Sequence, residues 1–251
     1  MVAVADRALS FGAGGDLPAA ESAVSKAYIL GASWHVLFAG DPSAADAIVA
    51  RAEQTLPSTT RRASRGEVER AFKTAYKEEV RKQVADNILS RFNLDWTDRA
   101  IASGRRGEIT KAILEYDLNT VFLIFGSDEA ERQHLFQVNN PGAVVSRDKI
   151  GYWAIGIGDR AAFAQLNVRL VTRLPVEHLV YRLCEAKFAC EGVDGVKEPT
   201  NVIVVNRRGE HGSLGASYID QLREIWERER RATPPSDTID IVKQAFRTML
   251  P

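Results

Sequence analysis

The sequence has few cysteines and few histidines, and neither set is spaced for a metal site or a disulfide framework. Its two cysteines, Cys184 and Cys190, lie in one predicted helix, at a spacing that points them to different faces. The four histidines are scattered, with no zinc-ligand spacing and no neighbouring nucleophile motif. We therefore expect buried free thiols, no metal and no other cofactor.

An excess of charge of one sign and long apolar runs are also missing. The 33 lysines and arginines balance 33 aspartates and glutamates, so no overall charge attracts nucleic acid or acidic membranes. No apolar run approaches the length of a transmembrane helix, and no signal peptide precedes the first apolar stretch. Arginine clusters are interpreted as solvated surface, and they occur at 61–62, 105–106, 207–208 and 227–231. These absences predict a cytoplasmic protein that binds neither nucleic acid nor membrane.

The most distinctive stretch that is present runs from Tyr152 to Ala161. Aromatic and β-branched residues predict a short buried strand, which Gly156 and Gly158 end in a turn before an amphipathic helix. The glycine spacing also matches a dinucleotide-binding fingerprint. However, the next two segments are predicted helices rather than a parallel strand, and Glu177 lies inside a helical pattern. The context therefore disfavours nucleotide binding.

Apolar periodicity predicts hairpins and paired helices along the 251 residues, 45% of which are hydrophobic. Asp41 or Ser43 is suited to cap the first helix, with Pro42 in its first turn. The predicted strands are 1–6, 26–30, 34–39, 120–125, 133–138, 152–155 and 201–205. The predicted helices are 44–56, 66–92, 108–116, 159–170, 175–190, 217–231 and a short amphipathic helix after Asp237.

This order, together with four local motifs, resembles the proteasome-like family of N-terminal-nucleophile (Ntn) hydrolases, of the proteasome β-subunit type. The segment 2–8 resembles the strand that carries the family's acidic residue, here Asp6. The segment 25–29 resembles the strand with the catalytic lysine, here Lys26. The turn at Gly40 and the segments 154–158 and 199–204 are similar to the oxyanion turn and to the second half of such a subunit.

The resemblance implies an α+β fold, a four-layer αββα sandwich with an extended helical pair at 61–115 and an extra C-terminal helix. Residues 1–232 would form this domain, followed by a linker and a short amphipathic helix at 233–251. The resemblance also implies assembly into a homo-oligomer, a ring or a dimer.

In such enzymes the first residue, a threonine, serine or cysteine, attacks an amide carbonyl while its own α-amine takes the proton. By analogy, the Lys26 ammonium would favour the deprotonated nucleophile, Asp6 would hold Lys26 charged and oriented, and the Gly40 N–H would stabilise the oxyanion. Taken one at a time, each residue also has a structural explanation. Asp6 fits a turn at the end of a strand, Lys26 an exposed lysine on a strand, and Gly40 a turn that opens a helix. Their joint order favours the catalytic interpretation.

The nucleophile itself is not among the first residues of this sequence. Met1 and Val2 carry no suitable side chain, and Ser10 and Ser25 are internal, so as written the chain cannot perform this chemistry. We expect the family's first strand and a nucleophile upstream of Met1, and hydrolysis of peptide or small amide bonds when they are present. The alternative is a non-catalytic ring-forming or scaffold protein on the same fold.

Overall fold

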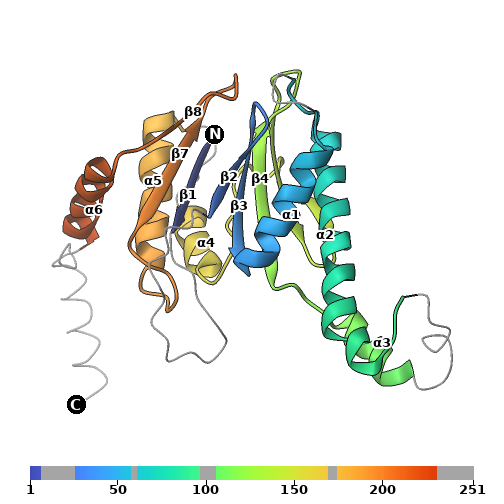
Figure 1. The fold of residues 1–251 in the computed structure, drawn as a ribbon. Helices are drawn as coiled ribbons and strands as arrows, with labels where there is room; N and C mark the ends of the chain where they lie inside the picture. The colour runs from blue at the N-terminus through green and yellow to red at the C-terminus, as the bar shows by residue number, and fades with distance from the viewer. Residues whose placement is uncertain (7–25, 58–60, 97–105, 169–173, 231–251) are drawn as a thin grey trace, which may run out of the picture. The chain divides into compact units, whose positions relative to one another are not determined.

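The structure, a computed structural model, describes residues 1–6, 26–57, 61–96, 106–168 and 174–230 (Figure 1). The chain divides into two compact units, Met1–Leu214 and Gly215–Pro251. The strands are β1 (Val2–Asp6), β2 (Ala27–Leu30), β3 (Trp34–Gly40), β4 (Thr120–Ser127), β5 (Gln133–Asn139), β6 (Ala143–Ser146), β7 (Thr200–Val205) and β8 (His211–Ser213). The helices are α1 (Pro42–Thr55), α2 (Arg65–Asn87), the 3-10 helix η1 (Leu89–Phe92), α3 (Arg106–Leu114), α4 (Asp159–Val168), α5 (Val176–Cys190) and, in the second unit, α6 (Ala216–Arg230).

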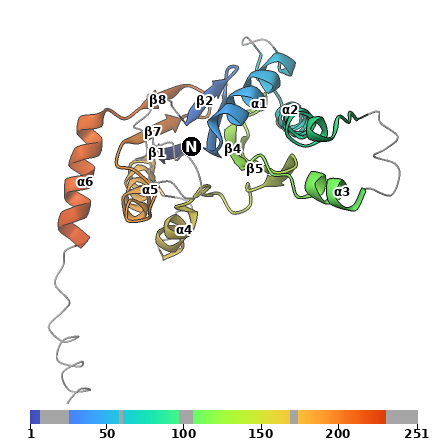
Figure 2. The same cartoon turned by 60° about the horizontal axis from the view of Figure 1, so that its bottom comes forward.

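An antiparallel five-stranded sheet, in the order β2-β3-β4-β5-β6, carries the larger core. Helices α1 and α2 lie side by side on one of its faces, where rings such as Phe72, Tyr76 and Phe122 are fully buried (Figure 2). Asp41 caps α1 through its carboxylate, and Ser64 starts α2 with a capping box. The two hairpins and the Asp41 cap of the first helix were predicted from the sequence, and the structure confirms them, whereas the Ser64 capping box was not predicted.

A second antiparallel sheet has the order β1-β7-β8, and helix α5 contacts β1 and β7. Its register places Ala3 opposite Ile203 and Asp6 opposite Thr200. Alternate residues of β1 face the five-stranded sheet, and the two sheets share an apolar cluster. The buried members of this cluster are Ala3, Leu37, Leu123, Phe125 and Val205. The fold is therefore α+β with two packed antiparallel sheets and helices outside them.

The predicted strand at 152–155 is wrong. The structure gives this segment no strand, although Val144 and Val145, just before it, form β6. Trp153 and Ile155 pack against the inter-sheet cluster, and the Arg147 guanidinium carbon lies 3.3 Å from the centre of a Trp153 ring. The aromatic and β-branched composition thus reflects burial of side chains rather than pairing of the backbone.

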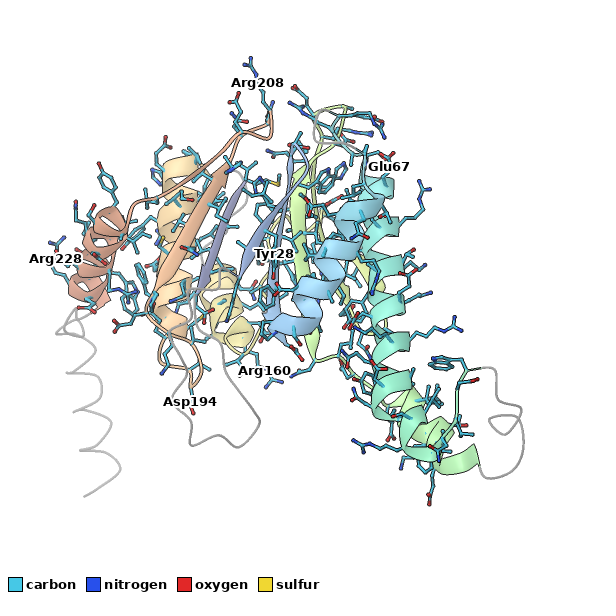
Figure 3. The ribbon with its side chains drawn as sticks, viewed as in Figure 1. Tyr28, Glu67, Arg160, Asp194, Arg208 and Arg228 are labelled. Carbon is cyan, nitrogen blue, oxygen red and sulfur yellow. The ribbon has the colours of Figure 1, made fainter. Side chains whose placement is uncertain are left out.

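Polar contacts join the loops at one end of the first unit. Arg62 donates from Nη2 to the Arg208 carbonyl over 2.7 Å, which connects the segment before α2 to the β7–β8 turn. Arg208 and Glu67 are labelled at this end in Figure 3, whereas Asp194 and Arg160 are labelled at the opposite end. None of the described helices is long and apolar enough to cross a membrane. The predicted helix after Asp237 lies outside the described residues.

Candidate active site

Asp6 and Lys26 meet where β1 ends and β2 begins. Lys26 Nζ lies 2.6 Å from Asp6 Oδ1, and the two side chains are only 17% and 12% exposed. The pair bridges the two sheets, because β1 and β2 belong to different ones. Limited exposure to water strengthens its attraction relative to a surface ion pair. The predicted partnership of these two residues is therefore present as a contact.

Gly40 ends β3 close to this pair, with a backbone that only glycine accommodates well. Its φ is +108°, and an added Cβ would lie 1.7 Å from the Asn119 carbonyl oxygen. Phe38 N–H donates to the Lys26 carbonyl, whereas Asp41 N–H donates to the carbonyl of Asn119 on the other side. Since successive residues of an inner strand alternate between neighbours, the Gly40 N–H points to the β2 side.

This N–H lies two residues beyond the Phe38–Lys26 bond, about 7 Å further along the strand. Helix α1 begins at Pro42, so its positive N-terminal end is adjacent. The arrangement suits a donor that stabilises a developing oxyanion.

The glycine turn after residue 155 borders the same place. Gly156 has φ +95°, and a methyl group there would lie 3.1 Å from Ala39 Cβ, next to Gly40. The Gly158 carbonyl accepts from Cys190 Sγ over 3.2 Å. Burial raises the pKa of the Cys190 thiol to about 11, which keeps it protonated and unreactive. The turn therefore forms a packed wall beside the site.

Thr200 is a site neighbour that sequence reasoning missed. It is the cross-strand partner of Asp6 and is only 9% exposed, with its hydroxyl donating to the Glu198 carbonyl over 2.8 Å. Lys187 stabilises the preceding loop, because its ammonium bonds to the Lys197 carbonyl at 2.6 Å. The sequence shows a threonine just before an apolar run. That Asp6 is its cross-strand neighbour depends on the register of β1 and β7, which the sequence does not give.

The Met1 amine lies at the other end of β1. It donates to the Val205 carbonyl over 2.5 Å, and burial lowers its pKa. Five residue steps along a strand separate Met1 from Asp6 by about 17 Å. This amine is therefore remote from Lys26 and Gly40.

One backbone edge of β1 has no strand beside it among the described residues. Met1 and Val205 exchange both of their backbone hydrogen bonds, since Val205 N–H also donates to the Met1 carbonyl over 2.8 Å. By alternation, the backbone groups of Val2, Val4 and Asp6 point away from β7. The free edge therefore runs directly to the candidate site.

The described side chains contain no group of three or more histidines, cysteines, aspartates or glutamates that could hold a metal ion. What they bring together is a carboxylate, an ammonium and a backbone N–H. These groups can shift proton affinities and stabilise negative charge, as acyl transfer requires.

Solved structures similar to this one come from several bacteria, although no family model and no curated protein matches the chain. Anbu (ancestral beta-subunit) from Yersinia bercovieri has a TM-score of 0.67 at 13% identity, covering 93% of each chain. Anbu from Hyphomicrobium sp. strain MC1 has a TM-score of 0.62 at 15% identity, covering 98% of this chain and 91% of that one. The helical assembly of the Anbu complex from Pseudomonas aeruginosa gives 0.62 at 15% identity, covering 94% of each chain.

These matches correct the predicted family. The resemblance to the proteasome β-subunit type is wrong, because the structures that match are Anbu proteins, a distinct family of proteasome-like Ntn-hydrolase relatives. Short motifs at Asp6, Lys26 and Gly40 cannot separate two families built on one scaffold. At these identities the likeness concerns the fold alone. The chain shares the fold of the Anbu structures.

Proposed function

We propose that this chain is a subunit of an Anbu-like assembly that hydrolyses peptide or small amide bonds. The observation that carries the proposal is the Asp6–Lys26 ion pair, with the N–H of Gly40 directed to the β2 side nearby. Asp6, Lys26 and Gly40 then act as the charge-orienting residue, the cation beside the nucleophile and the oxyanion donor. The proposal includes the complete four-layer αββα arrangement and a cytoplasmic location.

The nucleophile would begin a strand that precedes β1 and pairs with its free edge. Such a strand, joined to Met1 by a tight turn, would run antiparallel to β1. Its first residue would lie beside Asp6, close to Lys26. This placement assumes a strand as long as β1, and it is supported by the backbone groups of Val2, Val4 and Asp6, which point to that edge.

In the proposed reaction, a threonine, serine or cysteine side chain attacks the amide carbonyl and its own α-amine takes the proton. The Lys26 ammonium lowers the proton affinity of both groups by like-charge repulsion. The Gly40 N–H donates to the tetrahedral oxyanion, which then collapses as the α-ammonium gives its proton to the departing amine. Water attacks the resulting acyl group and frees the nucleophile.

Self-assembly is the second part of the proposal. The Pseudomonas aeruginosa neighbour is a helical assembly of Anbu, and it shares this fold over 94% of each chain. We infer that copies of the present chain associate in the same general way, through contacts between different surfaces. The alternative is a scaffold that assembles without hydrolysis. The following test distinguishes this scaffold from a hydrolase.

Lys26→Ala in the protein from its native source tests the proposed catalysis. We expect turnover of a peptide amide to fall by a factor of about 1,000 or more, since the cation beside the nucleophile is lost. Lys82→Ala is the matched control, because Lys82 is exposed on α2, and its turnover should be unchanged. Circular dichroism should show both variants folded. A wild-type protein without turnover, or a folded Lys26→Ala variant with full turnover, would refute the proposed catalysis.

A further inference from the structure

Helix α2 carries four exposed basic residues on one face. Their spacing of three or four positions places them in a single row about 16 Å long, called here the basic stripe. The basic stripe consists of Arg70, Lys73, Lys77 and Arg81.

The acidic residues near the basic stripe are engaged elsewhere. Glu69 pairs with Arg65 at 2.7 Å, and Arg51 lies within 3.4 Å of Glu78 and 3.2 Å of Glu79. Within the described ranges, no carboxylate forms an ion pair with any residue of the basic stripe. The stripe therefore presents uncompensated positive charge, although the whole chain has a net charge of zero.

Helix α6, in the second unit, carries a complementary row. Asp220, Glu224 and Glu227 follow one another at spacings of four and three residues, so they lie on one face, the acidic stripe. Arg223 lies on the same face, three residues after Asp220 and four before Glu227, while Arg228 bonds to Glu229 at 3.4 Å rather than to a stripe residue. Asp220 and Glu224 are exposed.

The two stripes have matching spacing and opposite charge. Three successive positions of the basic stripe, Lys73, Lys77 and Arg81, repeat every four residues, close to the repeat of the acidic stripe. Two helices laid side by side can therefore align three pairs of opposite charges. We propose that the basic stripe of α2 binds the acidic stripe of α6 from a second copy of this chain.

A contact of this kind joins two different surfaces. A row of copies joined in this way keeps a free basic stripe at one end and a free acidic stripe at the other, so addition continues until a ring closes or a helical assembly grows. The inference rests on the proposed self-assembly and names the surfaces that carry it. Because the basic stripe is exposed and Asp220 and Glu224 of the acidic stripe are exposed too, salt weakens the contact by screening.

Charge reversal tests the contact in the full chain, by sedimentation velocity over a concentration series. We expect Lys73→Glu with Lys77→Glu to weaken association about tenfold or more, and Glu224→Lys with Glu227→Lys to do the same. Mixing the two variants in equal amounts should restore association, because each then meets its complement. Raising salt from about 0.05 M to about 0.5 M should weaken the wild-type assembly.

A matched control reverses two exposed charges outside the basic stripe, Lys82→Glu with Arg91→Glu, and should leave association unchanged. A wild-type chain that stays monomeric would overturn the proposed self-assembly and this contact with it. A wild-type chain that assembles, while the stripe variants assemble equally well, would overturn the contact alone. A third outcome would also overturn the proposal. If a single chain that carries all four reversals assembles normally, while the mixture of the two double variants does not, the contact lies within one chain.

Discussion

At Gly40 the backbone conformation and the candidate chemistry both depend on the absence of a side chain. The positive φ brings Gly40 against the Asn119 carbonyl and turns its N–H towards the β2 side. A residue with a Cβ would have to move the β3–α1 corner, and the N–H would move with it. Glycine is therefore needed at this position for the backbone conformation, and in the proposed reaction the same residue supplies the oxyanion donor.

Gly40→Ala should lower the free energy of unfolding by more than about 3 kcal/mol, since the added Cβ would lie 1.7 Å from a backbone oxygen. Gly31→Ala is the control, because Gly31 also has positive φ, +54°, but nothing lies within 4 Å of an added Cβ. It should cost about 1 kcal/mol. Urea denaturation of both variants measures the difference, and equal losses would contradict the role of Asn119.

The resemblance to Ntn hydrolases indicated Asp6, Lys26 and Gly40, each next to the end of a predicted strand. The structure brings Asp6 and Lys26 into contact, while their catalytic roles stay predictions. Thr200 could not be found in the same way. Its place beside Asp6 comes from pairing of two strands far apart in the sequence, and local periodicity does not determine such a register.

At the scale of elements, the packing of the two sheets leaves one imidazole in an unusual position. His35 of β3 is 1% exposed, stacks on Phe125 at 5.4 Å and lies 5.1 Å from the His211 ring of β8. Neither of its ring nitrogens has a hydrogen-bond partner among the described residues. Burial, and then the nearby His211 and Met1 amine, lower the pKa of His35 to about 4.

His35 should therefore make folding stability depend on pH. Its folded pKa lies below the unfolded value of 6.5, so between these values the unfolded chain binds the proton more readily. The stabilisation is complete above pH 6.5 and is lost as the pH falls towards 4, on the order of 3 kcal/mol in all. Urea denaturation at a series of pH values measures this loss.

His35→Phe provides the comparison, because phenylalanine keeps the aromatic contact and cannot titrate. The loss of stability between pH 6.5 and 4 should shrink by the same amount in this variant. An unchanged pH dependence would show that another group causes it. The comparison uses differences between two proteins, so other titrating groups cancel.

The segment 152–155 shows where element prediction fails. Apolar and aromatic composition reports burial, and burial can be reached by an extended segment that pairs with no strand. Trp153 and Ile155 pack against the inter-sheet cluster. By contrast, β2 with β3 and β4 with β5 are hairpins, whose pairing is local and was predicted correctly.

For the whole molecule, the order of predicted elements was enough to indicate an α+β fold with two sheets, and the structure confirms that level of detail. The likeness to Anbu structures came only from comparing folds, because those proteins share only 13% to 16% of residues with this chain. Strand order within the second sheet depends on contacts between β1 and β7, which no sequence motif encodes.

The account of the whole molecule depends on what pairs with the free edge of β1. If a strand precedes β1, its first residue lies at the Asp6–Lys26 pair and Gly40 faces the reacting carbonyl. If none does, the site holds a cation and an oxyanion donor without a nucleophile. The two cases differ in the covalent structure of the mature chain, that is, in whether residues precede Met1.

The N-terminal sequence and intact mass of the protein purified from its native source measure this property directly. The account predicts a mature chain that extends upstream of Met1 and begins with threonine, serine or cysteine. A mature chain that begins at Met1 or Val2 would contradict the proposed hydrolysis and leave a scaffold on the same fold.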